Sequence, residues 1–383
     1  MKTRKKIVFL TGTRADFGKL KSLIDITENS ELFDVYIFVT GMHLIRKFGY
    51  TVDEIEKCGY KNIYTFKNHD FSNSSKSMDI SLANTIKGFN SFISKINPDL
   101  IIVHGDRVEA LAGAISGSLN NKLVAHIEGG EISGTIDELI RHAVTKMSHI
   151  HFVSNKQAAD RLTQLGEINN SIYVIGSPDL DLMNPTHLPD IDFVKNYYDI
   201  SFDNYALAAY HPVTTELEHI PKNAEIFVNS LIESKKNYVL IYPNNDLGNE
   251  LIIKEYKRLK NNKKFRIFPS LRFEYFLSLL KNADFIIGNS SAGIREAPYY
   301  NLPTIDIGTR QLNRFRGKTI LHCHHEERML LEAIDEIKDM NIQEIAKDKE
   351  THFGDGNSNK VFLSILKEDN VWGISPQKQF QDI

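Results

Sequence analysis

Short runs of β-branched and aliphatic residues recur along the chain, and each is followed by a stretch with helical periodicity. The runs are Ile7–Gly12, Val35–Gly41, Leu100–Gly105, Leu123–Ile127, Ile150–Ser154, Ile172–Gly176, Ala206–Tyr210, Tyr238–Tyr242, Phe265–Phe268, Asp284–Gly288 and Thr304–Ile307. Strands that alternate with helices are typical of parallel sheets with crossover connections. The pattern therefore predicts an α/β fold that binds ligands at the carboxyl ends of its strands.

The length of 383 residues exceeds what one hydrophobic core usually organises, so two domains are expected. The alternation is interrupted by a proline-containing stretch and then restarts. The predicted parts are an N-terminal Rossmann-like domain (1–177) with the acid/base carboxylates, a linker (178–200), a C-terminal Rossmann-like nucleotide-binding domain (201–365) and a tail (366–383) that could pack back on the first domain. We expect the two domains to face a central cleft, as in the glycosyltransferase-B architecture.

Composition excludes several classes of protein. The formal net charge of -3 and the pI near 6.5 give no broad attraction for nucleic acid or an anionic membrane. No segment approaches the roughly 20 apolar residues that span a bilayer, and the apolar run Ile7–Leu10 is too short for a signal peptide. Two cysteines, Cys58 and Cys323, cannot form a disulfide framework. These features favour a cytoplasmic protein that binds neither nucleic acid nor membrane.

The stretch from Asp284 to Glu296 predicts a buried strand, a small polar turn and the start of a helix. Ser290 and Ser291 would then lie at the helix N-terminus, where free N–H groups and the helix dipole bind phosphate. A serine that simply caps the helix is the alternative for one of the two. Glu296, further along the predicted helix, could accept the hydroxyls of a ribose or be a solvated charge.

The first strand leads into Thr11–Lys19, which contains neither the dinucleotide fingerprint nor the P-loop pattern. It presents Arg14, Asp16 and Lys19 at the end of the strand. Arg14 is suited to a bidentate phosphate contact, and an ion pair with Asp16 is the alternative interpretation.

Carboxylates follow two other strands of the first half. Asp106 comes directly after one strand and Glu128 after the next, while Asp137 opens the following predicted helix. Asp137 alone could merely stabilise the N-terminus of its helix. Because parallel strands end at the same edge of a sheet, we expect the three to meet, as general acid/base chemistry requires.

Strand ends of the second half supply polar donors. His211 follows one strand, Asn244 follows the next, and Arg310 follows a later one. Together with a phosphate site in the same domain, these residues suggest a nucleotide. A carboxylate cluster in one domain and a nucleotide site in the other suggest that the substrate is a sugar nucleotide.

Several of these motifs occur together in one known family. They are Arg14-Ala15-Asp16-Phe17 with Lys19, His104-Gly105-Asp106-Arg107, the stretch His126–Asp137, Arg141-His142, His211–Thr215, Pro243-Asn244, Gly288–Ser291 and Gly308-Thr309-Arg310. Over nearly its whole length the chain resembles the hydrolysing UDP-N-acetylglucosamine 2-epimerases of sialic and legionaminic acid synthesis. Non-hydrolysing relatives typically carry Gly-Thr-Arg-Pro-Glu, whereas the matching stretch here ends in Ala15-Asp16, which favours the hydrolysing branch. Phe17-Gly18 replaces the more usual Tyr-Ser.

The resemblance implies a two-step reaction. Anti elimination of UDP removes the proton at C2 and gives 2-acetamidoglucal; water then adds at C1 while a proton enters C2 from the opposite face. The products are UDP and N-acetylmannosamine. Positioned acids and bases move the protons, and cationic and N–H donors stabilise the departing diphosphate.

The resemblance also implies site residues. Asp106, Glu128 and Asp137 are the acid/base candidates, and we group Arg107 and His211 with them as catalytic. The implied substrate contacts are Arg14, Asp16, Lys19, His142, Asn244, Ser290, Ser291, Glu296 and Arg310. No cofactor or metal is expected, since the protein itself supplies cationic donors for the phosphates. The expected partners are the UDP-sugar, UDP and a second copy of the chain, because the relatives are commonly homodimers.

The sequence leaves other functions open. Hydrolysing 2-epimerases that act on UDP- or GDP-N,N′-diacetylbacillosamine resemble the chain too, and the sequence does not fix the preferred sugar. A glycosyltransferase would share the two-domain layout but would need an acceptor pocket. A binding protein without turnover is disfavoured because clustered carboxylates are costly without a task. An NAD-dependent epimerase is disfavoured because no dinucleotide fingerprint follows a strand.

Overall fold

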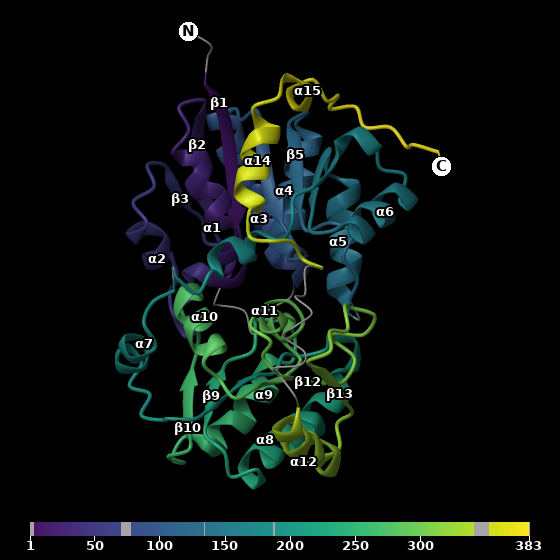
Figure 1. Cartoon of the computed structure of the whole chain (residues 1–383). Helices are drawn as coiled ribbons and strands as arrows, with labels where there is room; N and C mark the ends of the chain where they lie inside the picture. Colours follow the sequence, from purple (N-terminus) through teal and green to yellow (C-terminus); the bar gives the residue numbers. More distant parts are fainter. Residues whose placement is uncertain (1–3, 70–77, 134, 187, 341–351, 383) are drawn as a thin grey trace. The chain divides into compact units, whose positions relative to one another are not determined.

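The computed structural model of the chain describes residues 4–69, 78–133, 135–186, 188–340 and 352–382 (Figure 1). Gly134, within one of the motifs above, lies outside these residues. The chain forms two compact units: unit 1 comprises Met1–Glu131, Asp137–Leu182 and His352–Ile383, and unit 2 comprises Ile132–Ile136 and Met183–Thr351. Each unit contains one parallel sheet, so the predicted α/β class is confirmed.

The sheet of unit 1 has seven strands in the order β3-β2-β1-β4-β5-β6-β7. The strands are β1 (Lys5–Thr11), β2 (Phe33–Val39), β3 (Ile63–Thr65), β4 (Leu100–His104), β5 (Leu123–Ile127), β6 (Ile150–Val153) and β7 (Ile172–Val174). The chain builds outward from β1 to β3 and then continues on the other side of β1 with β4. The carboxyl ends of β1 and β4 are therefore the topological switch point, where open α/β sheets bind ligands.

The sheet of unit 2 has six strands in the order β10-β9-β8-β11-β12-β13. The strands are β8 (Ala206–Ala209), β9 (Tyr238–Ile241), β10 (Phe265–Phe268), β11 (Ile286–Gly288), β12 (Thr304–Ile307) and β13 (Ile320–Cys323). Its switch point lies between β8 and β11 by the same rule.

Two edge strands were not predicted. β3 has only three residues, too few for a periodic pattern, and β13 interrupts its apolar residues with an exposed histidine, His322. Edge strands need to bury less surface than central ones, so their hydrophobic signal is weaker.

Both faces of the first sheet are covered by helices, which is why its strands are continuously apolar. On one face, Ile7 and Phe9 share a core with Leu20 and Leu23 of α1 (Arg14–Glu28). On the other face, α4 (Val108–Leu119) approaches closely, because a Cβ at Gly113 would lie 2.7 Å from a methyl carbon of Val103. The first turn of α4 lies against the end of β1, because a Cβ at Gly12 would lie 2.9 Å from Cγ of Glu109.

The remaining helices follow the crossover plan. In unit 1 they are α2 (Val52–Lys57), α3 (Met78–Ile96), α5 (Ile136–Lys146), α6 (Lys156–Gln164), α14 (Ser358–Leu366) and α15 (Asp369–Trp372). In unit 2 they are α7 (Ile191–Tyr197), α8 (Ile220–Glu233), α9 (Asn249–Tyr256), α10 (Phe273–Lys281), α11 (Glu296–Tyr299) and α12 (Glu327–Glu336). Within the described ranges, none of them combines the length and hydropathy that a membrane crossing needs.

The boundary between the units differs from the predicted one. The chain returns to unit 1 at His352, so residues 352–365, expected in the second domain, belong to the first. The helix α14 packs beside α1, and its Phe362 and Ile365 lie in the core of unit 1 (Figure 1). Periodicity shows that α14 is amphipathic but not which core it covers. The predicted linker also contains α7, which belongs to unit 2.

Candidate functional site

Glu128, directly after β5, lies at the centre of a polar cluster in unit 1. Its Oε1 accepts a hydrogen bond from Ser177 Oγ at 2.8 Å. Its Oε2 lies 3.2 Å from His104 Nε2 and 3.7 Å from Lys19 Nζ. Lys19 Nζ is also 3.6 Å from Oδ2 of Asp179, which is fully buried. The cluster thus joins the ends of three strands to α1 and holds carboxylates against a buried cation.

The backbone of Glu128 has φ of 65°, in the left-handed region that a residue with a side chain rarely adopts. Such a conformation costs on the order of 1 kcal/mol or more and persists where the surroundings impose it, which is most often at functional sites. The strain turns the chain sharply at the end of β5 and leaves the carboxylate among its partners. Glu128, a predicted site residue, therefore has the strained backbone that is often found at functional sites.

A second group surrounds Asp106, directly after β4. The carboxylate of Asp106 forms an ion pair with Arg141, which is 2% exposed and lies on α5. Arg141 also donates to the carbonyl oxygen of Glu131 at 2.9 Å. Burial opposes the charge of Arg141, but Asp106, Glu131 and Asp137 outweigh it and raise the pKa of the guanidinium. Asp106 and Asp137 thus share one buried cation.

The two groups lie on neighbouring strands. In the parallel pairing of β4 with β5, His104 is opposite Ile127, so Asp106 and Glu128 each follow the paired ends closely. Arg107, the residue before α4, follows Asp106 at this edge. The expectation that these strand ends share one edge is met, although Arg141 and Asp179 were not among the predicted site residues.

Simple rules would have found both. Arg141 is four residues after Asp137, and residues at this spacing lie on the same face of a helix. Asp179 lies in the first turn that follows β7, so it too comes after the carboxyl end of a strand. By contrast, Nε2 of His142 lies 3.5 Å from Oε1 of Glu138 on the adjacent face of α5. About a third of the His142 side chain is exposed.

Two predicted contacts at the first strand have other roles in the structure. Asp16 accepts hydrogen bonds from the backbone N–H groups of Gly12 and Thr13, both at 3.0 Å, and from the hydroxyl of Thr11. Burial raises its pKa. Asp16 therefore holds the turn between β1 and α1, and its role as a substrate contact stays a prediction. Arg14 forms an ion pair not with Asp16 but with Glu54 of α2.

In unit 2, His211 follows β8 and is held by Asn289, which follows β11. The N–H of His211 donates to Asn289 Oδ1 at 2.6 Å, and Asn289 Nδ2 donates to the carbonyl of His211 at 2.9 Å. The N–H of Asn244 donates to His211 Nδ1 at 3.1 Å. Because Nδ1 accepts, a neutral His211 carries its proton on Nε2, and this N–H is a donor suited to an anion.

Two neighbours extend this arrangement. The carbonyl oxygen of Asn289 accepts from Arg310 Nη1 at 3.2 Å and from Gln311 Nε2 at 2.8 Å. The side-chain Oδ1 of Asn244 is buried and has no hydrogen-bond partner in the described part of the chain. Buried acceptors are rarely left unsatisfied, so Asn244 is suited to receive an N–H from a ligand.

The helix predicted at Ser290 is shorter than expected. Ser290 caps a three-residue 3₁₀ turn, Ser291–Gly293, and α11 begins separately at Glu296 and contains Pro298. Glu296 therefore opens a helix of four residues and is buried, so it is neither deep in a long helix nor a solvated charge. The dipole of so short an element is weak, which reduces that part of the argument for a phosphate site at Ser290 and Ser291.

Comparison with known proteins adds sequence relationships to this geometry. A family model described as UDP-N-acetylglucosamine 2-epimerase matches residues 25–367. A UDP-N-acetylglucosamine 2-epimerase of Neisseria meningitidis serogroup B is 45% identical over 380 residues, which are 99% of each chain. A UDP-N,N'-diacetylbacillosamine 2-epimerase (hydrolyzing) of Legionella pneumophila is 32% identical over 365 residues, 95% of this chain and 96% of its own.

A solved structure agrees with the fold. The crystal structure of Methanocaldococcus jannaschii UDP-GlcNAc 2-epimerase in complex with UDP-GlcNAc and UDP aligns with a TM-score of 0.79. It covers 94% of this chain and 99% of its own at 22% identity, so the likeness concerns the fold alone. The predicted pair of parallel-sheet α/β domains is thus the architecture of a solved relative.

Proposed function

Because the chain belongs to the UDP-N-acetylglucosamine 2-epimerase family, we propose that it is a hydrolysing member that converts UDP-N-acetylglucosamine and water into N-acetylmannosamine and UDP. The observation that carries the proposal is the set of carboxylates at the carboxyl edge of the sheet of unit 1, held against the buried cations Lys19 and Arg141. The Ala15-Asp16 stretch and the similarity to a relative named as hydrolysing support the choice of branch.

The chemistry explains why carboxylates are needed. C2 of the sugar has no neighbouring carbonyl, so direct removal of its proton would be very slow. Loss of UDP from C1 together with the C2 proton makes the step possible. Water then adds at C1 while a proton enters C2 from the opposite face, which inverts C2. Glu128, Asp106 and Asp137 are the proposed bases and acids, since positioned carboxylates can take up and deliver these protons.

The departing diphosphate needs hydrogen-bond donors that stabilise its negative charge. In unit 2, the Nε2–H of a neutral His211 and the guanidinium of Arg310 are the proposed donors, and Ser290 and Ser291 are secondary ones. The buried Oδ1 of Asn244 supports binding of uracil, whose N3–H is a donor of the required kind.

A proton NMR time course in deuterium oxide tests the reaction. With UDP-N-acetylglucosamine we expect UDP and free N-acetylmannosamine that carries deuterium at C2. UDP-N-acetylmannosamine without free sugar would identify a non-hydrolysing enzyme, and product that keeps its C2 hydrogen would rule out elimination. UDP- and GDP-N,N'-diacetylbacillosamine serve as comparison substrates, and the 45% identity to the Neisseria relative supports the N-acetylglucosamine substrate over them.

The proposal extends to the state of the protein. We propose a cytoplasmic homodimer that uses no cofactor. Size-exclusion chromatography with light scattering would test this state, since a mass twice the 43.7 kDa of the chain is expected. Turnover that a chelator abolishes and Mg²⁺ restores would contradict the metal-free part.

A further inference from the structure

The segment that follows α15 runs along unit 1 and is anchored at several points (Figure 1). His149 Nε2 donates to the carbonyl of Pro376 at 3.0 Å. The N–H of Gln381 donates to the carbonyl of Gly166 at 3.1 Å, and Gln381 Oε1 accepts from the N–H of Asn169 at 3.0 Å. Contacts on both sides of Lys378 therefore fix where its side chain enters the protein.

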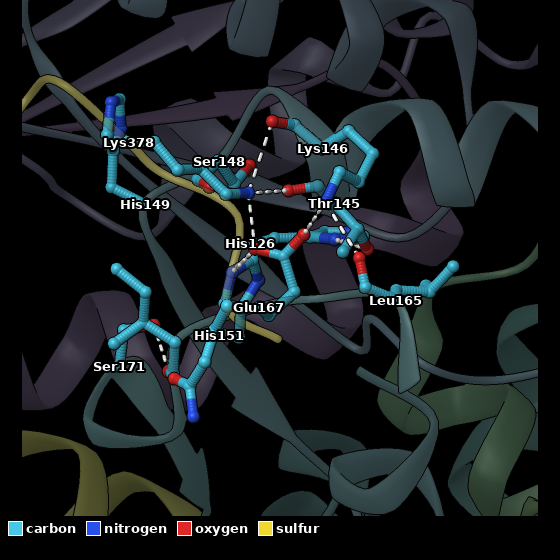
Figure 2. A network of polar contacts seen from close by, with 12 residues as sticks. His126, Thr145, Lys146, Ser148, His149, His151, Leu165, Glu167, Ser171 and Lys378 are labelled. Atoms are coloured by element: carbon cyan, nitrogen blue, oxygen red, sulfur yellow. Dashed lines mark hydrogen bonds and ion pairs between the residues drawn. The ribbon is translucent and has the colours of Figure 1, made fainter. Parts of the chain in front are cut away.

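Lys378 closes the C-terminal end of α5. Its Nζ donates to the carbonyl oxygens of Thr145, Lys146 and Ser148 at 2.9, 3.1 and 2.7 Å (Figure 2). The last carbonyl groups of a helix have no partner within the helix, and a cation there also complements the helix dipole. One side chain from the distant tail thus satisfies the end of a helix that carries Asp137 and Arg141.

A buried carboxylate pairs with Lys378 and stabilises this arrangement. Glu167 is fully buried, and its Oε2 forms an ion pair with Lys378 and accepts from His151 Nε2 at 2.9 Å (Figure 2). Its Oε1 lies 2.9 Å from Lys146 Nζ. Removing one partner of a buried charge is far more disruptive than removing an exposed one, because the remaining charge is left in a poorly solvated place.

The helix α5 is connected to Asp106 by two routes. In the first, Arg141 forms the ion pair with Asp106 directly. In the second, Thr145 Oγ1 lies 3.1 Å from His126 Nδ1, and His126 Nε2 donates to the carbonyl of Gly105 at 2.8 Å. Burial lowers the pKa of His126 to about 3, so it stays neutral and keeps this tautomer. The second route begins at Thr145, whose carbonyl oxygen Lys378 contacts, and the first begins at Arg141, in the middle of α5.

We propose that Lys378 is a positioning residue for the carboxylate site: by clamping the end of α5, it fixes Arg141 and the loop of Gly105, and through them the carboxylate of Asp106. The inference rests on the proposed function for its kinetic readout. Proton transfer depends on sub-ångström placement of the acid or base, whereas nucleotide binding is proposed to depend on unit 2. Loss of the clamp should therefore lower turnover without weakening nucleotide binding.

The test compares three variants. Lys378→Met removes the charge and the donors, and Lys378→Arg keeps both. Lys156→Met is the matched control, because the side chain of Lys156 is 85% exposed and forms an ion pair with the exposed Asp160 on the same helix. We expect kcat for UDP-N-acetylglucosamine to fall about tenfold in Lys378→Met, with KM and the Kd for UDP within twofold of wild type. Lys378→Arg should recover most of kcat, and the control should be unchanged.

Two measurements distinguish a positioning role of Lys378 from a purely stabilising role. They also distinguish failure of this inference from failure of the proposed function. Thermal unfolding gives the assay temperature at which every variant is folded; a lower Tm with unchanged kcat would mean that the tail only stabilises the fold. Amide hydrogen exchange needs no activity: Lys378→Met should speed exchange in peptides spanning Gly105–Arg107 but not in those spanning Ala206–His211. Unchanged exchange at Gly105–Arg107 would overturn the inference even if wild type proved inactive.

A milder variant covers the case in which Lys378→Met fails to fold. Thr145→Val keeps the shape of the side chain but removes the hydroxyl next to His126. It should lower kcat severalfold with an unchanged Kd for UDP, and normal kcat would contradict the second route. Wild-type protein that folds but turns over no UDP-N-acetylglucosamine would refute the proposed function alone.

Discussion

The two switch points share a topology but differ in the chemistry of their side chains. In unit 1 the strand ends bring charges together: Glu128 and Asp179 around Lys19, and Asp106 beside Arg141. In unit 2 the strand ends around His211 are joined by neutral groups, mainly the amide of Asn289. The same sheet geometry can therefore serve proton transfer or anion binding, depending on which residues follow the strands.

The difference has an electrostatic basis. A carboxylate next to a cation is held in a fixed position, which suits a group that accepts a proton at a defined place. In unit 2, hydrogen bonds through Asn289 orient His211 and Arg310, whose N–H groups are the proposed donors to the diphosphate. The variants described next each change one of the two units, so each tests one side of this comparison.

The largest expected effect concerns the carboxylates of unit 1. Asp106→Asn, Glu128→Gln and Asp137→Asn keep the size of each side chain but remove proton transfer, so turnover should fall at least about 10²-fold. Calorimetry should find the affinity for UDP preserved, because the proposed donors lie in unit 2. A variant that blocks only hydration should release UDP and accumulate 2-acetamidoglucal, visible as a vinylic proton by NMR. Three variants with nearly normal turnover would refute the acid/base assignment.

The next effect tests the buried charge of Glu167. Burial raises its pKa, but His151, Lys146 and Lys378 outweigh burial and hold it at about 2 instead of the usual 4.5. Its contribution to stability is therefore complete above pH 4.5 and is lost as the pH falls toward 2. Linkage predicts that wild type loses about 2 kcal/mol from this group between pH 6 and pH 3.

Urea unfolding at pH 6 and pH 3 measures this loss. The Glu167→Gln variant should be less stable than wild type at pH 6 but should lose less stability on acidification, by about 2 kcal/mol. Equal acid sensitivity in the two proteins would show that the ion pairs around Glu167 do not hold its charge in solution.

A smaller effect is expected in unit 2. Ser290→Ala together with Ser291→Ala should weaken UDP binding about tenfold, the scale of one or two charge-assisted hydrogen bonds. The short 3₁₀ turn at these serines makes the hydroxyl groups, rather than a helix dipole, the expected donors. Unchanged affinity would indicate that His211 and Arg310 make the phosphate contacts instead. The Arg310→Gln variant would then show the larger loss of affinity for UDP.

The smallest effect is expected at His142. Its side chain faces Glu138 on a partly exposed face of α5, while Asp137 and Arg141 are buried on the adjacent face. His142→Ala should therefore change kcat/KM by less than about threefold, since exposed ion pairs contribute little. A large fall in kcat/KM would show that His142 belongs to the site. The site would then include residues from two faces of α5.

The fold could be predicted from the sequence where burial is strong. The central strands are continuous apolar runs, so their existence and parallel arrangement follow from pattern alone. The edge strand β3 and the return of α14 to unit 1 depend on which surfaces meet, and no local pattern records that.

The same distinction applies to the site residues. Asp106 and Glu128 are recognisable because they follow strands directly. Asp16 also follows a strand, but its carboxylate is used by neighbouring backbone N–H groups. The sequence shows that a polar residue reaches the edge of the sheet; only the hydrogen bonds show whether it faces a ligand or the protein.

The discontinuity of unit 1 has a consequence for the order of synthesis. Phe362 and Ile365 of α14 belong to the core of unit 1, although the whole of residues 183–351 is made between them and the first part of that core. At about 5–20 residues per second, a ribosome needs on the order of 10 to 30 s for this stretch. During that time the nascent first sheet exposes the apolar surface that α14 later covers. Unit 2, almost continuous in sequence, can finish folding earlier, so chaperone protection during translation should be needed mainly by the half of the protein that is synthesised first.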